Sequence, residues 1–280
     1  NSSAASDVYK RQVPLVVRIP ENFKGLVDHE RGTRTDGFVS FIDFGPTVLT
    51  LAGLAGPEQM DGKPFLGKGT TAEELASCDE AFGYADRFDE KYDLVRTLRK
   101  GKWEYVRNYQ GFYPDGLQNN YRYRMLAFSE WRELYKAGKL NAAQSQFFEA
   151  RPAEQLFDIS ADPHEVNDVS KNPDNQEILQ KMRRRMTEKV KAIHDLSFYP
   201  ESHMASKALG DGVAYGEKHT REINRLVDIA DLALVPFAKA RQSLASAMEA
   251  KNPWERYWAC ITSAVHGEAA NPLVPAVNKH

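Results

Sequence analysis

The sequence contains little cysteine. Cys78 and Cys260 are its only two, and they lie far apart in unlike surroundings. Such a pair forms neither a metal-ligand spacing nor a disulfide framework, so two separate thiols are expected. Long hydrophobic runs are also lacking, since none approaches the roughly 20 residues of a membrane-spanning helix. The sequence therefore predicts neither a disulfide-stapled protein nor one with a membrane span.

A strong excess of charge of one sign is absent as well. The formal net charge is −2 over 280 residues, which gives no electrostatic basis for binding nucleic acid or an anionic membrane. Hydrophobic residues make up 42% of the chain, enough for a sizeable core at this length. No signal-peptide pattern is visible at the N-terminus. Residues 1–12 read NSSAASDVYKRQ and are expected to be a foreign or disordered tail.

Local patterns predict several elements in the first half of the chain. The valine-rich residues 13–19 are typical of a strand buried on both faces. Residues 45–54 have helical spacing, with Asp43 just ahead, Pro46 in the first turn, and Gly53 or Gly56 at the end. Residues 93–109 alternate as a β-hairpin does around Lys100-Gly101-Lys102.

The second half is predicted to be mainly helical after one more strand at residues 156–159. Residues 175–196 carry an apolar stripe, with the basic run 183–185 on the solvated face. Residues 199–219 read as a polar linker, and an Ala-rich helical pattern begins near residue 220. Asn252-Pro253 is a helix start, and Gly267 suits a helix end.

Two segments in fixed order carry a family resemblance. Residues 38–57 read FVSFIDFGPTVLTLAGLAGP, and residues 152–169 read PAEQLFDISADPHEVNDV, with RFDEKYDLVRTLRKGKWEYVRNY between them. This combination resembles the C-terminal half of sulfatases of the alkaline-phosphatase superfamily, above all bacterial relatives of sulfohydrolases acting on glucosamine. Further on, NPWERYWA resembles the wording of HEAT-type helical repeats.

The resemblance implies an α/β fold assembled from several parts. Residues 13–91 would be the end of an alkaline-phosphatase-like sandwich, and residues 92–198 a small α+β subdomain with an antiparallel sheet and a helix. After the linker at 199–219, residues 220–280 would be an incomplete HEAT-like segment. The chain would thus be truncated at both ends, and its helical segment could dock a protein partner.

The resemblance also implies a reaction. A sulfatase hydrolyses sulfate esters or sulfamates, here on a carbohydrate, with a formylglycine nucleophile and calcium. The family's Cys-x-Pro-Ser-Arg or Ser-x-Pro-Ser-Arg motif and its Asp-Asp metal pair do not occur in this sequence. The expectation is therefore a fragment with no catalytic residue and no metal ligand of its own, inactive alone. Family members are usually exported, so the resemblance implies a periplasmic or extracellular location.

The best candidates for substrate binding are Asp86, Arg87 and Asp89. Their stretch resembles the family's Arg-Asp-Arg-Met-Asp-Glu segment beside the sulfate pocket. An arginine fork suits sulfate, and aspartate accepts from sugar hydroxyls. The alternative is a solvated turn whose charges pair with each other.

For the other residues that could bind a ligand or metal, the sequence favours structural roles. Asp43 is expected to cap the helix that follows it rather than to bind metal. His164 is expected to lie in an Asx-type turn set by Asp162. A group of aromatic residues is expected to form the hairpin core rather than a sugar platform: Trp103, Tyr105, Tyr109, Phe112 and Tyr113.

Two rival functions stay open at this point. One is a phosphodiesterase or phosphatase of the same superfamily, which shares the sheet but uses a Ser or Thr nucleophile and zinc. The other is a non-catalytic binding protein that uses its helical repeats. The sequence upstream of residue 13 would discriminate them, since the nucleophile motif predicts the chemistry.

Overall fold

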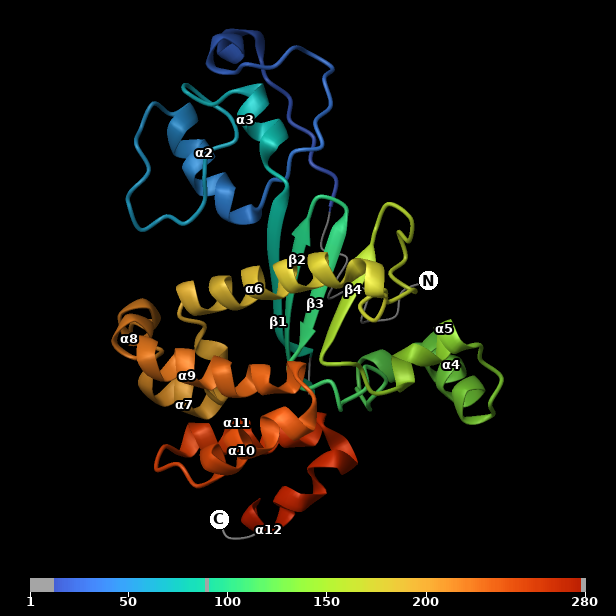
Figure 1. Cartoon of the computed structure of the whole chain (residues 1–280). Helices are drawn as coiled ribbons and strands as arrows, with labels where there is room; N and C mark the ends of the chain where they lie inside the picture. Colours follow the sequence, from blue (N-terminus) through green and yellow to red (C-terminus); the bar gives the residue numbers. More distant parts are fainter. Residues whose placement is uncertain (1–12, 89–90, 278–280) are drawn as a thin grey trace. The chain divides into compact units, whose positions relative to one another are not determined.

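A computed structural model describes residues 13–88 and 91–277. Its core element is a four-stranded antiparallel sheet in the order β1-β2-β3-β4, accompanied by many helices (Figure 1). The described residues form two compact units. The larger unit contains residues 83–88, 91–97 and 104–277, and the smaller unit contains residues 13–82 and 98–103. The fold is thus mixed α/β, as the sequence predicts.

The sheet confirms the predicted hairpin. Its strands are β1 (Glu80–Phe88), β2 (Lys91–Lys100), β3 (Trp103–Asn108) and β4 (Glu154–Asp158). Gly101 has a φ of 53°, a left-handed conformation that suits glycine in the tight turn between β2 and β3. Val95, Val106 and Phe157 form a buried cluster on one face. Because side chains alternate along a strand, Leu94 and Arg96 point to the opposite face.

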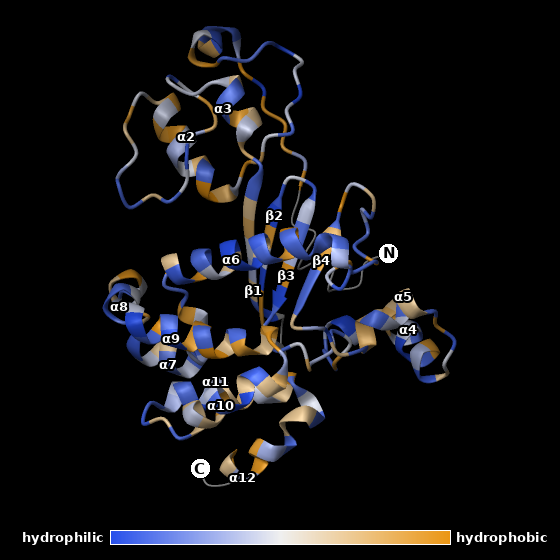
Figure 2. Ribbon diagram, in the orientation of Figure 1, coloured by the Kyte–Doolittle hydropathy of each residue, from blue (hydrophilic) through white to orange (hydrophobic). Residues whose placement is uncertain are grey.

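The helix α6 (Gln176–Ala192) also matches its prediction. Its buried positions are Leu179, Met182, Met186 and Val190, spaced at three or four residues as an amphipathic helix requires. Ile193 is 44% exposed because it follows the helix end and leaves the stripe. Figure 2 shows hydrophobic and hydrophilic residues mixed along α6. The apolar stripe is thus the buried side of α6.

One prediction for α6 is wrong. Arg183, expected on the solvated face, forms an ion pair with Glu154 of β4 and donates Nε to its Oε2 at 2.9 Å. The same Oε2 accepts the hydroxyl of Tyr105 at 2.9 Å. A long arginine can reach a strand from the border of an apolar stripe, so helical spacing alone did not predict this contact. Arg184 and Arg185 are exposed as expected.

The remaining helices of the larger unit follow in sequence. They are α4 (Leu126–Lys136), α5 (Ala142–Ser145), α7 (Glu201–Lys207), α8 (Gly212–Lys218), α9 (Thr220–Asp231), α10 (Phe237–Met248), α11 (Pro253–Val265) and α12 (Val274–Val277). The predicted start of α11 is confirmed, because the Asn252 side chain accepts from the backbone of Trp254 at 2.8 Å. Gly267 follows the helix with a φ of 58°. Within residues 199–219, expected as a linker, α7 and α8 are helical.

Short 3₁₀ helices connect many of these elements. They span Glu21–Leu26, Phe41–Asp43, Arg122–Arg124, Gln146–Phe148, Pro173–Asn175, Leu196–Phe198, Leu232–Leu234 and Gly267–Leu273. Among the residues that the structure describes, no helix combines the length and the apolar character that crossing a bilayer requires.

The smaller unit departs from the sequence prediction at its beginning. Residues 13–19 form no strand, and Val13, Leu15, Val16 and Val17 are exposed. A strand buried on both faces exists only between neighbours that supply hydrogen bonds, and no described strand pairs with this run. The prediction of a buried strand is therefore wrong for this chain.

The helices of the smaller unit are α2 (Phe44–Leu51) and α3 (Ala72–Ser77). The predicted helix α2 is confirmed, with Pro46 in its first turn and Gly53 beyond its end at a φ of 76°. A row of large apolar side chains on and before α2 is exposed: Phe41, Ile42, Phe44, Val48 and Leu51. An apolar surface of this kind normally marks a contact with further protein.

An aromatic cluster joins α7, α8 and α11 of the larger unit. His203 stacks on Tyr199 with ring centroids 4.7 Å apart and meets the edge of Trp254 at 4.8 Å. Its Nε2 lies 2.8 Å from the Tyr215 hydroxyl. Burial lowers the pKa of His203. The charge of Glu222 acts to raise this pKa, whereas His219 and Lys207 lower it further. The folded protein therefore favours the neutral imidazole.

This lowered pKa predicts a loss of stability in acid. The contribution of neutral His203 is complete above the ordinary pKa of 6.5 and is lost as the pH falls through and below it. We expect the melting temperature to drop between about pH 7.5 and about pH 5.5, and His203→Gln to reduce this drop. The control is His164→Gln, since His164 is exposed in a turn. An unchanged drop in His203→Gln would contradict the prediction.

Candidate functional site

Asp86 and Arg87 are consecutive residues of β1, so their side chains leave the strand on opposite sides. Asp86 Oδ1 accepts from Arg96 Nη1 at 2.8 Å. The Asp86 side chain remains 34% exposed. Among the described residues no hydrogen bond reaches its Oδ2. Asp89, the third predicted substrate-binding residue, lies outside the described residues.

The residue that holds Asp86 is Arg96 of β2, whose side chain is only 2% exposed. Its Nε and Nη2 donate to the two carboxylate oxygens of Asp195, at 2.7 and 3.0 Å. Its Nη1 also donates to the backbone carbonyls of Ala85 and Val95. Burial opposes the charged form, but Asp195 and then Asp86 outweigh it and raise the pKa of Arg96. A permanent cation therefore fixes the partly exposed carboxylate of Asp86.

Arg87 forms a different kind of pair. Its guanidinium binds both carboxylate oxygens of Glu201, the first residue of α7, and both side chains are nearly half exposed. The hydrogen bond to Arg87 lowers the pKa of Glu201, and the same bond raises the pKa of Arg87. The guanidinium of Arg87, which the sequence predicts to bind sulfate, is thus paired with the Glu201 carboxylate in this structure. An anionic ligand would have to compete with Glu201 for it.

Two tyrosines flank this arrangement. Tyr92 donates its hydroxyl to the carbonyl of Ser197 at 2.9 Å, and burial is the main reason why its pKa is raised. Tyr84 of β1 is 62% exposed, and the Arg96 Cζ lies 5.9 Å from the centroid of its ring. The site therefore presents an exposed aromatic ring beside a partly exposed carboxylate, both in contact with one buried arginine. Carboxylate and ring are suited to hydroxyl-rich ligands.

The sequence predicts Asp86 and Arg87 as candidate binding residues, but it does not indicate their partners Arg96, Asp195 and Glu201. One signal for Arg96 was present, since it stands between Leu94 and Leu98 on the same side of β2. A charge between two apolar neighbours on one face of a strand indicates a buried ion pair. Asp195 and Glu201 carried no such pattern, because their positions depend on how the chain returns to the sheet.

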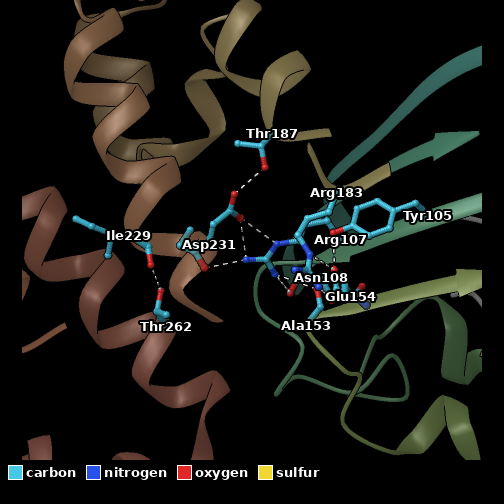
Figure 3. Close-up of polar contacts among 11 residues, drawn as sticks. Tyr105, Arg107, Asn108, Ala153, Glu154, Arg183, Thr187, Ile229, Asp231 and Thr262 are labelled. Atoms are coloured by element: carbon cyan, nitrogen blue, oxygen red, sulfur yellow. Dashed lines mark hydrogen bonds and ion pairs between the residues drawn. The ribbon is translucent and has the colours of Figure 1, made fainter. Parts of the chain in front are cut away.

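A second buried arginine, Arg107 of β3, ties the sheet to α9 (Figure 3). Its Nη2 donates to the carbonyl of Ala230 at 2.8 Å, and its Nη1 to that of Ala153 at 2.9 Å. Its Nε lies 3.3 Å from Asp231 Oδ1, and Asp231 Oδ2 accepts the hydroxyl of Thr187 at 2.8 Å. All these donors are used within the fold, so this network is structural.

Asp43 has a structural role, although not the predicted one. Its Oδ2 accepts from the backbone of Ser40 at 2.8 Å, and its Oδ1 from the backbone of Lys63 at 2.9 Å. No side-chain bond caps α2, so the predicted helix cap is wrong. Because Asp43 also closes a preceding 3₁₀ turn, its carboxylate points back along the chain and holds the loop at Lys63.

Asp162 has the predicted structural role, but its side chain bonds four and five residues along the chain rather than two, so the turn is not of the Asx type. Asp162 Oδ2 accepts from the backbones of Val166 and Asn167 at 2.8 and 2.7 Å, while His164 is exposed. Tyr105 and Tyr109 are buried in the core, as expected for the aromatic group, but Tyr113 is exposed.

The described residues bring together no group of three or more His, Cys, Asp or Glu side chains able to hold a metal ion. The two cysteines are not near each other in sequence, Cys78 is exposed, and burial raises the pKa of the Cys260 thiol. A raised pKa disfavours the thiolate that acts as a nucleophile.

Comparison with known proteins relates the chain to sulfatases. An ulvan-active sulfatase of Formosa agariphila is 34% identical over 198 residues, which are 69% of this chain and 31% of that protein. A second ulvan-active sulfatase of the same organism is 25% identical over 195 residues, 66% of this chain and 34% of that protein. The chain spans about a third of the length of these relatives.

No family model matches the chain. Among solved structures, a 2-O GAG sulfatase is 18% identical with a TM-score of 0.33 over 55% of this chain and 25% of its own. Another, solved in complex with D-glucosamine-2-N,6-O-disulfate, is 15% identical with a TM-score of 0.33 over 53% of this chain and 23% of its own. By its sequence identity to the Formosa agariphila enzymes, the chain is a relative of carbohydrate sulfatases over about two thirds of its length.

Proposed function

We propose that this chain is the C-terminal, substrate-side part of a sulfatase that hydrolyses sulfate esters or sulfamates on a carbohydrate. The observation that carries the proposal is the 34% identity to an ulvan-active sulfatase over 198 residues. The partly exposed carboxylate of Asp86, fixed by a buried arginine, supports a role in holding sugar hydroxyls. Asp86, Arg87 and Asp89 are the proposed substrate-binding residues.

The proposed role of Arg87 is to bind an anionic group of the substrate by exchanging its partner. Glu201 occupies the guanidinium fork in the structure, and both side chains are nearly half exposed. An exposed ion pair contributes little stability, so an arriving sulfate can displace the carboxylate at small cost. Phosphate-like and sulfate-like oxygens match the geometry of the arginine fork as well as a carboxylate does.

The smaller unit is proposed to be the end of a larger α/β domain. The valine-rich residues 13–17 are exposed without a strand partner, and α2 exposes a row of apolar side chains. Both features require additional protein to bury them. The relatives are about three times as long as the segment that matches, so they are long enough to include such a domain. Residues 220–280 are proposed to continue as HEAT-like repeats that dock a protein partner.

Formylglycine and calcium do not fit the residues present here. The sequence has no Cys-x-Pro-Ser-Arg or Ser-x-Pro-Ser-Arg motif, and Ser77-Cys78-Asp79 does not resemble one. Calcium takes six or more oxygen ligands, and the described side chains gather no acidic cluster of three. Nucleophile and metal are therefore proposed to lie in sequence upstream, in a protein exported to the periplasm or the cell exterior.

We expect the purified 280-residue chain to release no product from a chromogenic aryl sulfate, even with calcium added. The physical reason is that displacement at sulfur needs an activated nucleophile and charge neutralisation, and the chain supplies neither group. The rate should equal that of buffer alone. The matched control is the same assay with a chain carrying Asp86→Asn, which should give the same background.

The decisive companion measurement is the DNA sequence upstream of the codon for Val13 in the source genome. A frame that reads through a Cys-x-Pro-Ser-Arg or Ser-x-Pro-Ser-Arg motif and an Asp-Asp pair supports the proposal. A bare Ser or Thr nucleophile with zinc ligands contradicts it in favour of a phosphatase or phosphodiesterase. Turnover of the aryl sulfate by the chain alone would contradict the placement of the reaction centre.

A further inference from the structure

We propose that Tyr84 is a stacking platform for one pyranose ring of a carbohydrate ligand, with Asp86 accepting hydrogen bonds from hydroxyls of the same ring. This inference rests on the proposed function and deepens it, because it names what the chain itself recognises: the uncharged face of a sugar rather than its sulfate group. The sequence predicts a binding role in this segment for Asp86, Arg87 and Asp89 only.

The geometry of β1 brings the ring and the carboxylate together. Tyr84 and Asp86 stand two positions apart in a strand, so their side chains leave the same face about 7 Å apart along the chain. An aromatic ring and a hydrogen-bond acceptor at this spacing can meet a single sugar unit. Such a unit offers C–H groups on its face and hydroxyls on its edge, which match the ring and the carboxylate respectively.

An exposed tyrosine alone would mean little, since single apolar side chains are common on protein surfaces. Tyr84 differs because a buried cation lies over its ring. The Arg96 Cζ is 5.9 Å from the ring centroid, within the range of a cation–π contact. Arg96 is itself held by Asp195 and by backbone carbonyls. The Arg96 guanidinium therefore lies on one side of the ring, while 62% of Tyr84 is exposed.

The charges of the site select the ligand. Arg96 is shared by Asp86 and Asp195, so these three side chains together carry more negative than positive charge. An anionic sulfate would be repelled at this position, whereas hydroxyl donors are attracted to the exposed carboxylate. The structure thus favours a hexopyranose face with adjacent hydroxyls at Tyr84, and leaves any sulfate of the same ligand to other groups.

The test measures binding of the 280-residue chain to oligosaccharides prepared from ulvan and to the same material after chemical desulfation. Saturation-transfer NMR reports which sugar protons lie against protein, and calorimetric titration gives the dissociation constant. We expect the desulfated preparation to retain binding through Tyr84 and Asp86, and the sulfated preparation to bind more tightly because Arg87 can exchange Glu201 for an anionic group. Tyr84→Ala should weaken binding by about tenfold or more, as expected for loss of an aromatic contact at the centre of a site.

Matched variants distinguish the contribution of the Tyr84 ring to binding from that of its hydroxyl. They also show whether removing any exposed tyrosine has the same effect. Tyr84→Phe retains the ring and should bind within about twofold of the unchanged chain. Tyr121→Ala removes another tyrosine of the larger unit that is 70% exposed and should have no effect. Equal losses in Tyr84→Ala and Tyr121→Ala would show non-specific adhesion and overturn the inference.

The remaining outcomes separate this inference from the proposed function. Loss of binding in Asp86→Asn together with full binding in Tyr84→Ala overturns the stacking role and leaves the substrate-binding role of Asp86 intact. Absence of binding by the unchanged chain overturns the inference, whereas the sulfatase assignment is judged separately by the upstream sequence. Binding that disappears on desulfation also overturns it, because recognition would then depend on sulfate.

Discussion

Replacing Arg96 with methionine is expected to destabilise the larger unit by about 3–5 kcal/mol. The methionine fills most of the space but leaves the buried carboxylate of Asp195 without its cation. It also removes the donor that fixes Asp86 and the bonds to two backbone carbonyls. Hydrogen exchange followed by mass spectrometry should show the loss of protection first in β1, β2 and residues 195–199.

Three companion variants make the Arg96 result interpretable. Arg87→Met removes an arginine from an exposed ion pair and should change protection little, since exposed pairs contribute little. Arg96→Lys keeps the charge but not the fork, so it should be destabilised less than Arg96→Met. The double variant Arg96→Met with Asp195→Leu should recover much of the loss, because no charge stays buried alone. Equal stability of Arg96→Met and Arg87→Met would contradict the argument.

Arg107→Met is the second large expected effect, at about 3 kcal/mol. The Arg107 side chain is 1% exposed, so the carbonyls of Ala153 and Ala230 would lose buried donors that water cannot replace. Its stacking over the ring of Tyr109, with Cζ 4.3 Å from the centroid, would also be lost. Hydrogen exchange should show β3 and α9 losing protection together, because one side chain joins them.

The control for Arg107 is Arg184→Met, which removes the same residue type from the exposed face of α6 and should leave exchange unchanged. If Arg107→Met lowered the protection of α9 and left β3 as before, the helices would be independent of the sheet. That outcome would contradict the role of this network as a structural tie and would favour a separate helical domain.

The elements that the sequence predicted correctly are those determined by neighbouring residues. The hairpin follows from alternation around Gly101, α6 from its apolar stripe, and the start of α11 from Asn252 and Pro253. Each depends on backbone geometry or on side chains within one or two turns. The relation to sulfatases also came from sequence, since short phrases such as LFDISADPHEVND keep their order along the chain.

The incorrect predictions share one physical cause. Residues 13–19 have the composition of a buried strand, but a strand needs hydrogen-bonding neighbours that composition cannot supply. Asp43 has the position of a helix cap, yet its oxygens are taken by Ser40 and Lys63. In both cases contacts outside the predicted element decide the outcome: the run has no strand partner among the described residues, and Asp43 binds Ser40 of the preceding 3₁₀ turn and Lys63, 20 residues on.

The sequence by itself therefore determined the periodic elements, the turns and the family relationship, because these depend on local geometry and on residue order. Only the tertiary structure decided the partners at the candidate site. Asp195 lies 99 residues from Arg96, and Glu201 lies 114 from Arg87. A buried arginine is stable only where carboxylates and carbonyls converge on it, and that convergence is a property of the folded chain.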